Sequence, residues 1–349
     1  MTKRALIAMS GGVDSSLAAA LLLEQGYAVE GVTMKLSAGV CCDIGSAMAV
    51  CERLGIAHRV IDAQELFSRE IVDYFISQYL HGRTPNPCIR CNERVKFSLL
   101  LDYARSRGFD FLATGHYARI ERCADPGIFR LLTGIDAGKD QSYFLYRLDQ
   151  EQLKMILFPL GGLLKSDVRA MARERGLPAA ERPESQEVCF IPDDDYRAFL
   201  RDHAPEGLLP GELVMTDGTV VGRHDGIALF TVGQRRKLGV AAGERLYVVR
   251  IEPDTRRVVL GKKQDLEVSV ITIADVRFFA LEALLEPLAV EAKIRYRSPL
   301  AAAVIEPSGG GRIRVSFDHP VSGVSPGQAC VFYQGERVVG GGVIEEQRS

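Results

Sequence analysis

Apolar and polar positions in the first part of the chain follow a pattern that predicts strands alternating with helices. The short apolar runs that are typical of buried strands lie at 5–9, 28–34, 57–61 and 109–114. Apolar positions at helical spacing predict helices over 15–25, 47–54 and 97–107. Gly26 and Gly55 stand where two of these helices should end. Since strands that alternate with helices form parallel sheets, we expect an α/β domain with a doubly wound parallel sheet.

The second part of the chain is richer in turns and short β segments. Gly, Pro and Asp separate β-rich segments at 245–249, 257–260, 290–295, 312–317 and 329–333. This spacing is typical of small β domains of the barrel type. We therefore expect the α/β domain over 1–204, a central β-rich domain over 205–266 and a C-terminal β-barrel over 267–349.

Composition is that of an ordinary globular protein. The 349 residues are 47% hydrophobic and 25% charged, which is enough apolar material for the cores of two or three domains. No apolar stretch approaches the ~18 residues of a membrane-spanning helix, and the N-terminus lacks the apolar segment of a secretory signal. Eight cysteines without an export signal indicate a reducing compartment and thiol or metal chemistry. A cytoplasmic protein without a membrane partner is expected.

A loop rich in serine and glycine, residues 10–16, joins the first predicted strand to the first predicted helix. Its glycines let a ligand approach the backbone, and the start of the helix favours a phosphate. No Gly-Lys-Ser/Thr is present, so the loop is not a Walker A sequence. A plain turn in which Asp14 or Ser15 caps the helix is the structural alternative. Because open α/β sheets bind ligands where their strands end, a phosphate site is favoured, and Gly115 is expected at the same sheet edge.

Cys88 and Cys91 follow two prolines and an asparagine, which predicts a loop at this position. Arg90, Arg94 and Lys96, with a helix expected to begin near residue 92, should favour the thiolates. A Cys-x-x-Cys pair is compatible with a redox dithiol, half of a zinc site or part of an iron–sulfur cluster. The sequence offers no second pair or His-x-x-x-His that would complete a zinc site.

Cys189 has apolar neighbours within residues 181–195, a segment with six acidic residues and one arginine. A buried inert thiol is therefore as good an interpretation as a reactive one. Cys51 and Cys330 also have apolar neighbours and are predicted to be small core residues. The cysteines without distinctive context are Cys41, Cys42 and Cys123.

Together these motifs resemble one family, the bacterial tRNA-specific 2-thiouridylases (the MnmA/TrmU family). The first block by itself also resembles the PP-loop of ATP pyrophosphatases, which split ATP between its α- and β-phosphates. The blocks that carry the resemblance are 9–15, 82–87, 91–92, 114–118, 139–145, 185–186 with 189–191, 222–226, 293–297 and 325–328. The resemblance runs nearly end to end, and it implies an N-terminal PP-loop domain and a C-terminal barrel that contacts tRNA.

The resemblance implies ATP-dependent 2-thiolation of the wobble uridine of tRNA. Attack of uridine O2 on the α-phosphate of Mg²⁺-bound ATP would release pyrophosphate and leave an adenylated base. A persulfide on Cys189, charged by a sulfur-relay protein or a cysteine desulfurase, would then deliver sulfur and expel AMP. Cys91, as second catalytic thiol, would end in a disulfide with Cys189. A monomer is the expected form, and residues 181–195 are expected to be mobile because Cys189 must meet both donor and base.

The resemblance also assigns residues to each substrate. ATP would be bound by Ala8, Met9, Ser10, Gly11, Gly12, Val13, Asp14, Ser15, Met34 and Gly115. The tRNA would be bound by Asn86, Pro87, Cys88, His116, Lys139, Asp140, Gln141, Arg295, Tyr296 and Gln328. The formal charge of the chain is −2, but the stretches 81–97, 223–237 and 293–297 each carry a net +3, so a polyanion can still bind locally.

Three alternatives stay open at the level of the sequence. In the same reaction, Cys88, Cys91 and Cys189 would hold a 4Fe–4S cluster whose open iron binds the sulfide donor; some family members carry Asp in place of Cys88. An ATP pyrophosphatase that acts on a small metabolite would explain the PP-loop, but it leaves the cysteines and the β-rich region without a task. A non-catalytic RNA-binding protein with a regulatory nucleotide site is opposed by the pairing of an adenylating loop with thiols.

Overall fold

The computed structural model describes residues 2–36, 43–123, 127–180, 188–240, 245–279 and 283–348, with the side chains of 346–348 left aside. The chain divides into two compact units. Unit 1 comprises residues 1–71, 88–190 and 336–338, and unit 2 comprises residues 72–87, 191–335 and 339–349. Each unit has a hydrophobic core of its own.

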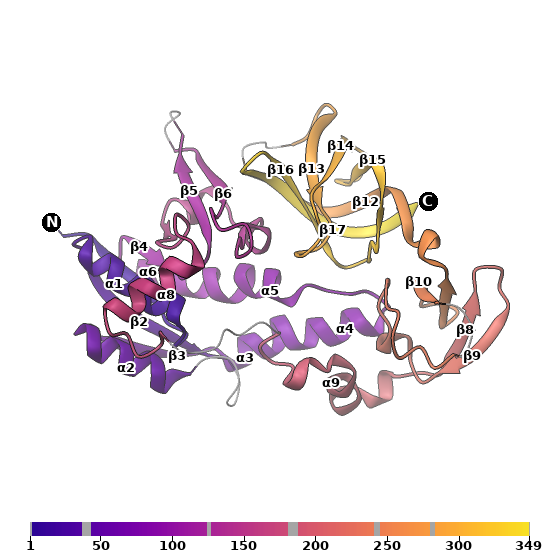
Figure 1. The fold of residues 1–349 in the computed structure, drawn as a ribbon, viewed down its shortest axis with the longest axis horizontal. Coiled ribbons are helices and arrows are strands. Elements are labelled where there is room, and N and C mark those ends of the chain that lie inside the picture. Colours follow the sequence, from indigo (N-terminus) through magenta and orange to yellow (C-terminus); the bar gives the residue numbers. More distant parts are fainter. Residues whose placement is uncertain are drawn as a thin grey trace. The chain divides into compact units, whose positions relative to one another are not determined.

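The elements are labelled in Figure 1 where space allows. The strands are β1 (Arg4–Ala8), β2 (Ala28–Lys35), β3 (His58–Asp62), β4 (Phe111–Ala113), β5 (Ala118–Arg122), β6 (Phe129–Thr133), β7 (Ile156–Leu157), β8 (Gly211–Met215), β9 (Val220–His224), β10 (Tyr247–Glu252), β11 (Arg257–Gly261), β12 (Glu267–Phe278), β13 (Leu288–Lys293), β14 (Ala301–Pro307), β15 (Ile313–Ser322), β16 (Ala329–Gln334) and β17 (Arg337–Arg348). The α-helices are α1 (Val13–Glu24), α2 (Ile44–Leu54), α3 (Gln64–Phe67), α4 (Tyr74–Leu80), α5 (Pro87–Arg90), α6 (Ser98–Ser106), α7 (Gln150–Leu153), α8 (Lys165–Glu174) and α9 (Tyr196–His203). The π-helical turns are η1 (Ser68–Asp73) and η2 (Cys91–Phe97), and the 3₁₀ turns are η3 (Ser142–Leu145), η4 (Pro192–Asp194), η5 (Pro205–Gly207), η6 (Ile227–Leu229) and η7 (Lys263–Leu266). Among the described residues, no helix is both long and apolar enough to cross a bilayer.

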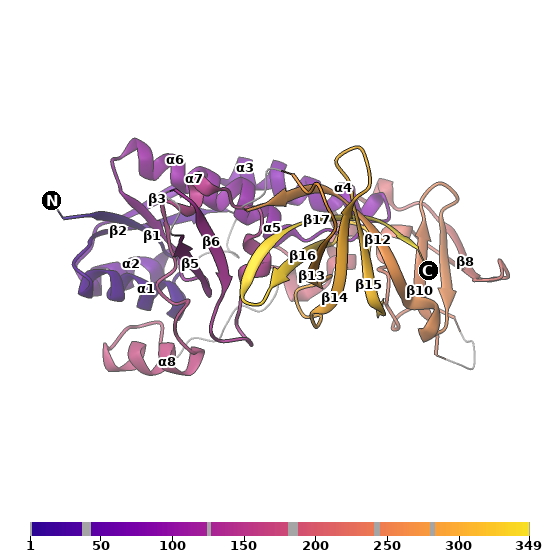
Figure 2. The ribbon, with the colours of Figure 1, turned by 90° about the horizontal axis from the view of Figure 1, so that it is seen from above.

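Unit 1 is built on a five-stranded parallel sheet with the order β3-β2-β1-β4-β7. Ile7 of β1 pairs with Gly31 of β2 on one side and with Ala113 of β4 on the other. Figure 2 shows α6 on one face of this sheet and α1, α2 and α8 on the other. The predicted doubly wound α/β domain is therefore confirmed. An antiparallel hairpin of β5 and β6, which the apolar pattern did not indicate, also belongs to unit 1.

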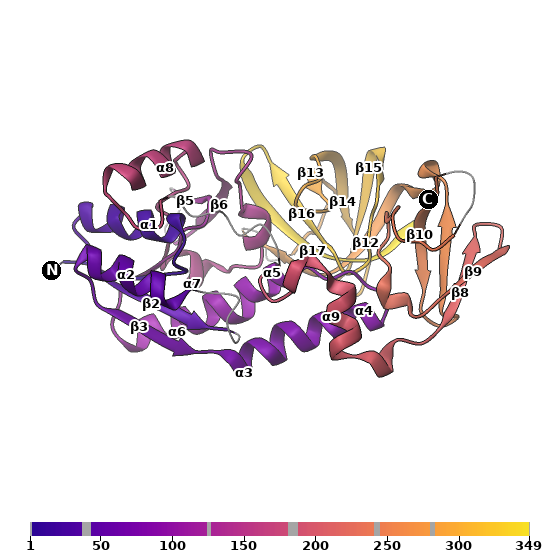
Figure 3. The same ribbon diagram turned by 60° about the horizontal axis from the view of Figure 1, so that its bottom comes forward.

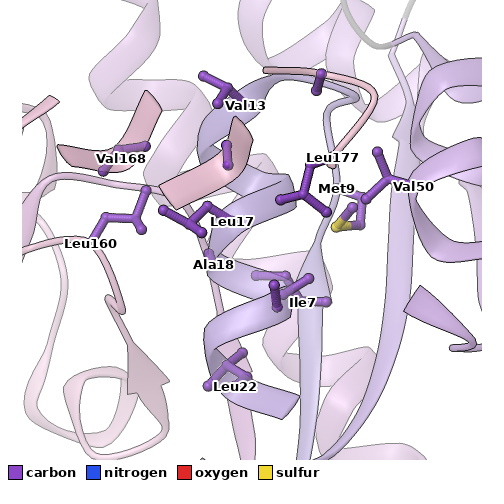
Figure 4. Packing of buried hydrophobic residues seen from close by; sticks show 14 of the residues in the cluster. Ile7, Met9, Val13, Leu17, Ala18, Leu22, Val50, Leu160, Val168 and Leu177 are labelled. Atoms are coloured by element: carbon purple, nitrogen blue, oxygen red, sulfur yellow. The ribbon is translucent and has the colours of Figure 1, made fainter. Parts of the chain in front are cut away.

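The apolar run of β1 is explained by burial on both faces of the sheet. Ile7 and Met9 belong to one hydrophobic cluster with Leu17 of α1 (Figure 4). Val168 of α8 joins the same cluster, while Leu6 points to the opposite face and is also fully buried. Burying one such leucine side chain stabilises the fold by about 1.5–3 kcal/mol. This packing holds the end of β1 against α1, and the loop that follows β1 leads directly into α1 beside the start of α2.

The helix ends predicted from glycines are confirmed, but the loop predicted from the prolines before Cys88 is wrong. Gly26 and Gly55 follow α1 and α2 with φ of +83° and +68°, a conformation that glycine adopts without strain. The helix predicted over 97–107 extends much further toward the N-terminus, because α5, η2 and α6 follow one another without a break. Cys88 and Cys91 therefore lie in a helix and not in a loop. The reason is that Pro87 occupies the first helical position, where a missing N–H group costs nothing.

Unit 2 contains two β assemblies, both visible in Figure 3. One is a four-stranded sheet with the order β10-β11-β8-β9. The other runs β12-β15-β14-β13-β16-β17, and β17 pairs back with β12, which closes a barrel. Alternate residues such as Ile271, Ile273 and Val315 fill its interior. The predicted β-rich central region and C-terminal barrel are confirmed, and the exact boundaries after residues 204 and 266 stay predictions.

Candidate active site

The serine- and glycine-rich loop lies at the carboxyl end of β1 and leads directly into α1. Gly12 is the residue that precedes the helix, and within the described structure no side chain caps the first N–H groups. The alternative in which Asp14 or Ser15 caps the helix is therefore excluded. The uncapped start of a helix carries a partial positive charge, which favours an anion at this loop, and the predicted phosphate site stays a prediction.

Hydroxyl groups inside the loop hold its shape. Ser15 Oγ donates a hydrogen bond to the Gly12 carbonyl at 3.1 Å and accepts one from the Ser10 N–H group at 3.2 Å. Gly11 has a φ of +79°, and a Cβ there would lie 2.8 Å from the carbonyl oxygen of Asp43. Only glycine fits this position without strain.

Gly115 and Met34 reach this site from neighbouring strands. A Cβ on Gly115 would lie 2.9 Å from both the carbonyl carbon of Asp14 and the nitrogen of Ser15. Met34 is near the end of β2 and is buried, as is Met9 at the end of β1. The structure thus brings the predicted ATP-binding residues together at one sheet edge, and their contacts with ATP stay a prediction.

The Asp14 carboxylate binds two groups that the sequence pattern did not indicate as site residues. Lys165 Nζ donates to Oδ1 at 2.6 Å and to Oδ2 at 2.8 Å, and the Tyr117 hydroxyl donates to Oδ1 at 2.7 Å. Lys165 is 8% exposed and Tyr117 is 3% exposed. A signal for Lys165 did exist. It stands in the first turn of α8, where the helix dipole opposes a cation, so an anionic partner was to be expected.

The three cysteines with distinctive sequence surroundings share one neighbourhood in unit 1. Cys88 is exposed in the first turn of α5, Cys91 is buried at the start of η2, and Cys189 is half-buried. The charge of a Cys189 thiolate would raise the pKa of both other thiols, which places all three within electrostatic reach. This proximity links two parts of the chain that are far apart in sequence.

The segment that carries Cys189 is held on its C-terminal side. The Phe190 ring packs edge-on against the buried ring of Phe67 in α3, with the centroids 5.7 Å apart. Residues 181–187 lie outside the described residues. The predicted mobility of 181–195 therefore stays a prediction for the part before Val188.

Burial controls the pKa of the thiols. Burial raises the pKa of Cys91 to about 12, and the nearby ammonium of Lys96 opposes this only in part. The pKa of Cys88 is also raised, because protein atoms displace water from around its sulfur although the residue as a whole is exposed, and Lys96 again opposes the change. The expectation that the basic cluster favours the thiolates is therefore wrong for the protein without substrates.

The arginines of this cluster are engaged elsewhere. Arg90 Nε donates to the Glu70 carbonyl at 2.7 Å, and its Nη2 donates to the Glu70 carboxylate at 3.1 Å. Arg94 is paired with Glu93 at 3.7 Å. Lys96, five positions after Cys91 in η2, is the basic residue of this cluster whose charge opposes the rise in the pKa of both thiols.

In the protein without substrates, Cys91 should react very slowly with iodoacetamide. A pKa of about 12, against an ordinary value of 9.0, leaves about 1000-fold less thiolate at pH 8. The pKa is raised, so labelling should accelerate about tenfold per pH unit up to about pH 11. Lys96→Met should slow it further, whereas Lys154→Met, at an exposed lysine, should not. Mass spectrometry of the labelled peptide measures the rate, and labelling at pH 7 as fast as that of an unfolded peptide would contradict the prediction.

His116 is a neutral hydrogen-bonding group. Burial, reinforced by the nearby Lys96, lowers the pKa of His116 to about 3. Its Nδ1 is 2.7 Å from Thr114 Oγ1, and its ring lies against those of Phe97 and Phe158. The predicted contact of His116 with tRNA stays a prediction, and it would be made by a neutral imidazole.

Residues 139–141 form a turn that is fastened to the strand end after β4. Asp140, which is 7% exposed, accepts hydrogen bonds from the N–H groups of Gly134 and Ser142 at 2.9 and 3.1 Å. Gln141 Oε1 accepts the N–H of Tyr117 at 3.0 Å. Lys139 is half-buried in the same turn. These contacts shape the turn, and the predicted tRNA contacts of its residues stay predictions.

In unit 2, Gln328 lies beside the segment that leads to Asn86 and Pro87. Its Nε2 donates to the carbonyl oxygens of Thr84 at 3.0 Å and Pro85 at 3.4 Å. The Thr84 N–H group also donates to the Pro326 carbonyl at 2.8 Å. These contacts hold Gln328 next to the segment that leads into Asn86 and Pro87, and the predicted tRNA contacts of all three residues stay predictions.

Arg295 and Tyr296 follow β13 at the surface of unit 2. The exposed Arg295 donates to the Ser322 carbonyl at 3.2 Å. The Lys293 ammonium lies 5.6 Å from the centre of the Tyr296 ring. Positive charge and an aromatic ring in one place are suited to a nucleic acid, and the predicted tRNA contact stays a prediction.

The described cysteines do not form a cluster-binding set. Among the described residues, no group of three or more His, Cys, Asp and Glu side chains is arranged to hold a metal ion. Cys88, Cys91 and Cys189 are all within the described ranges, so the structure gives no support for a 4Fe–4S cluster on these three residues. Sulfur chemistry is therefore derived from the thiols alone.

The remaining cysteines agree with their predicted structural role where they are described. Cys51 and Cys330 are 1% and 0% exposed, and burial raises the pKa of Cys51 to about 11 and that of Cys330 still further. Both are core residues, as predicted. Cys123 is half-buried just after β5, and Cys41 and Cys42 lie outside the described residues.

Family models match almost the whole chain. The tRNA methyl transferase HUP domain matches residues 3–193, the tRNA methyl transferase PRC-barrel domain matches 197–262, and the aminomethyltransferase beta-barrel domain matches 268–344. Among solved structures, a 4-thiouridine synthetase–RNA complex with bound ATP is 18% identical, with a TM-score of 0.39 over 59% of this chain and 51% of that one. The NMN synthetase of Francisella tularensis is 18% identical, with a TM-score of 0.35 over 53% and 67%. Scores this low carry no argument about this chain.

Curated relatives are similar over nearly their full length. The tRNA-specific 2-thiouridylase MnmA of Geobacter metallireducens is 49% identical over 98% of this chain and 97% of that protein. The proteins of the same name from Pelotomaculum thermopropionicum and Carboxydothermus hydrogenoformans are 47% and 45% identical, over 98% and 99% of this chain and 97% and 98% of theirs. By these identities and by the matching family models, the chain belongs to the tRNA-specific 2-thiouridylase (MnmA/TrmU) family.

Proposed function

We propose that this protein is an ATP-dependent sulfurtransferase that converts the wobble uridine of tRNA to 2-thiouridine. The observation that carries the proposal is that one compact unit holds both an anion-binding loop at the start of α1 and the neighbouring thiols Cys91 and Cys189. Activation of a base by ATP and delivery of sulfur are the two tasks of the reaction. The relatives named tRNA-specific 2-thiouridylase support tRNA as the substrate.

In the first step, ATP binds with its Mg²⁺ ion, and its phosphates face the loop and the positive end of α1. Uridine O2 attacks the α-phosphorus, the bond between the α-phosphorus and the bridging oxygen breaks, and pyrophosphate leaves. The base now carries AMP on O2, which is a far better leaving group than the original oxygen. The loop around Gly11 and Ser15, held by its internal hydrogen bonds, would position the phosphates for this attack.

In the second step, the terminal sulfur of a Cys189 persulfide attacks C2, the C2–O bond breaks and AMP leaves. The thiolate of Cys91 then attacks the inner sulfur, which releases 2-thiouridine and leaves a Cys91–Cys189 disulfide. A dithiol reductant from outside supplies the two electrons that regenerate the thiols. Because the pKa of Cys91 is about 12 without substrates, this attack should be assisted by raised pH or by a change in environment when tRNA binds.

The tRNA is held by both units in this proposal. In unit 1 the contacts come from His116 and residues 139–141, and in unit 2 from Asn86–Pro87, Arg295–Tyr296 and Gln328. The basic stretch 293–297 contributes phosphate contacts, so affinity should fall with salt. A sulfur-relay protein or a cysteine desulfurase charges Cys189, and the enzyme works as a monomer in the cytosol, where thiols stay reduced.

Thiolation with purified components tests the proposal. With unmodified tRNA, ATP and a persulfide donor, we expect 2-thiouridine at the wobble position and one AMP and one pyrophosphate for each sulfur transferred. Asp14→Ala should lose this activity, because Asp14 lies in the first turn of α1 beside the loop, whereas Asp102→Ala on the surface of α6 should not. ATP–pyrophosphate exchange without tRNA would favour an enzyme for a small metabolite, and full thiolation by Asp14→Ala would exclude the proposal.

A further inference from the structure

Lys165 occupies a position that is unfavourable for a lysine. It is the first residue of α8, where the positive end of the helix dipole repels its charge, and it is 8% exposed. Lysine is rarely buried to this degree without an electrostatic partner. Its backbone N–H group donates to Asp136 Oδ2 at 2.9 Å, so the start of the helix is held in place. A buried ammonium at this position indicates that Lys165 has a role other than stabilising α8.

The partner of Lys165 belongs to the ATP loop. Its Nζ contacts both oxygens of Asp14, at 2.6 and 2.8 Å, and lies 5.5 Å from the centre of the Tyr117 ring. The Tyr117 hydroxyl holds Oδ1 of Asp14 from another direction, at 2.7 Å. The ammonium is therefore fixed beside the first turn of α1, where the anion-binding end of the helix lies.

The loop itself has no lysine. In a Walker A sequence, a lysine of the loop neutralises the β- and γ-phosphates, but residues 10–16 contain no basic residue. Bound ATP brings several negative charges, and the helix end supplies only about half an elementary charge. A buried ammonium next to the loop would supply the missing positive charge.

We propose that Lys165 is the phosphate-binding lysine of the ATP site, and that Asp14 and Tyr117 hold it in position before ATP arrives. When ATP binds, the ammonium would turn from Asp14 to the β- and γ-phosphates, and the Asp14 carboxylate would then be available to hold the Mg²⁺ ion of the nucleotide. Lys165 forms no covalent bond in this step and stabilises the charge that develops on the departing pyrophosphate. This inference rests on the proposed function, because it assigns Lys165 to the adenylation step.

A purely structural ion pair between α8 and α1 is the competing explanation. The two helices already pack through apolar residues such as Leu17 and Val168. If the pair only joined the helices, its loss would weaken every ligand of the site to the same extent. A phosphate-binding role instead separates ligands that contain the β- and γ-phosphates from AMP, which lacks them.

Calorimetric titration of Lys165→Met with Mg²⁺-pyrophosphate, Mg²⁺-ATP and AMP separates these cases. We expect pyrophosphate and ATP to bind about 10- to 100-fold more weakly, with AMP affinity changed less than about twofold. Lys165→Arg should recover part of the loss, because it keeps the charge. Lys154→Met, at an exposed lysine after α7, is the matched control and should bind all three ligands as the natural protein does.

If Lys165→Met lost affinity for AMP and for pyrophosphate to the same extent, or bound pyrophosphate as tightly as the natural protein, the inference would be overturned. Lys165→Gln keeps a hydrogen-bond donor near Asp14 and most of the side-chain volume, so it takes the place of Lys165→Met if that variant does not fold. The proposed function fails separately. If the natural protein binds ATP but does not thiolate tRNA, the proposed function is wrong. The role of Lys165 in binding phosphates is tested by the titration alone, whatever the outcome of the thiolation assay.

Discussion

Cys189→Ser should reduce thiolation of tRNA by at least about 10³-fold, while tRNA-dependent release of pyrophosphate and formation of adenylated tRNA in a single turnover continue. A serine hydroxyl cannot carry a persulfide, so the adenylated base finds no sulfur nucleophile, yet the ATP loop is untouched. Nucleoside mass spectrometry measures 2-thiouridine, and labelled ATP reports pyrophosphate and the AMP that is attached to tRNA. Cys123→Ser, at a half-buried thiol just after β5, is the matched control and should stay within about twofold of the natural enzyme.

Cys91→Ser should lose thiolation to a similar extent, but at a later stage. The persulfide on Cys189 should still form and be detected by mass spectrometry, because sulfur passes from the donor to Cys189 and not to Cys91.

Cys88→Ala separates the thiol route from the cluster route. In the thiol route kcat should persist even if tRNA affinity falls, since no step uses the Cys88 thiol. Thiolation by Cys189→Ser at the natural rate would contradict the assignment, and loss of bound iron together with activity in Cys88→Ala would restore the cluster alternative.

Gly161→Ala should lower the free energy of unfolding by about 2–3 kcal/mol or more. A Cβ at this position would overlap the carbonyl group of Ala118, and the turn cannot move away easily because the Gly161 carbonyl accepts the N–H group of Ile135 at 3.0 Å. At the neighbouring Gly162, a Cβ would meet no atom of the described residues within 4 Å, so Gly162→Ala should change stability by less than about 1 kcal/mol. Urea unfolding followed by circular dichroism measures both variants.

The same substitution should disturb the ATP site. Gly161 lies just before α8, whose first residue is Lys165, and Ala118 directly follows Tyr117, so a shift between them moves both partners of Asp14. Folded Gly161→Ala protein should therefore lose affinity for pyrophosphate more than for AMP. Equal stability of the two alanine variants would show that the contact with Ala118 is not restrictive.

Features that depend on neighbouring residues could be predicted from the sequence. The buried strand at β1 follows from an uninterrupted apolar run, and the ends of α1 and α2 follow from Gly26 and Gly55, whose φ values are positive. The loop at the end of β1 could also be recognised, because its glycines and its place between strand and helix are local properties.

Features that depend on burial or on distant partners could not be predicted from the sequence. Prolines suit both a loop and the first turn of a helix, so the helix that contains Cys88 and Cys91 was missed. Basic neighbours in the sequence indicated lowered thiol pKa values, but Arg90 is bound to Glu70 and burial raises the pKa of Cys91 to about 12. Desolvation is set by the packing of the whole unit, which no short segment encodes.

The sequence by itself determined the alternation of strands and helices that begins the chain, the serine- and glycine-rich loop after β1 and the identity of the thiols, because local periodicity and local turn chemistry specify them. Only the tertiary structure decided which side chains from distant parts of the sequence contact one another at the site. Lys165 and Asp14 are 151 positions apart, and Tyr117 and Asp14 are 103 apart, yet all three meet beside the loop. Such pairs form because parallel strands end at one edge of the sheet and α8 packs on α1, so the physical reason lies in the packing of the core.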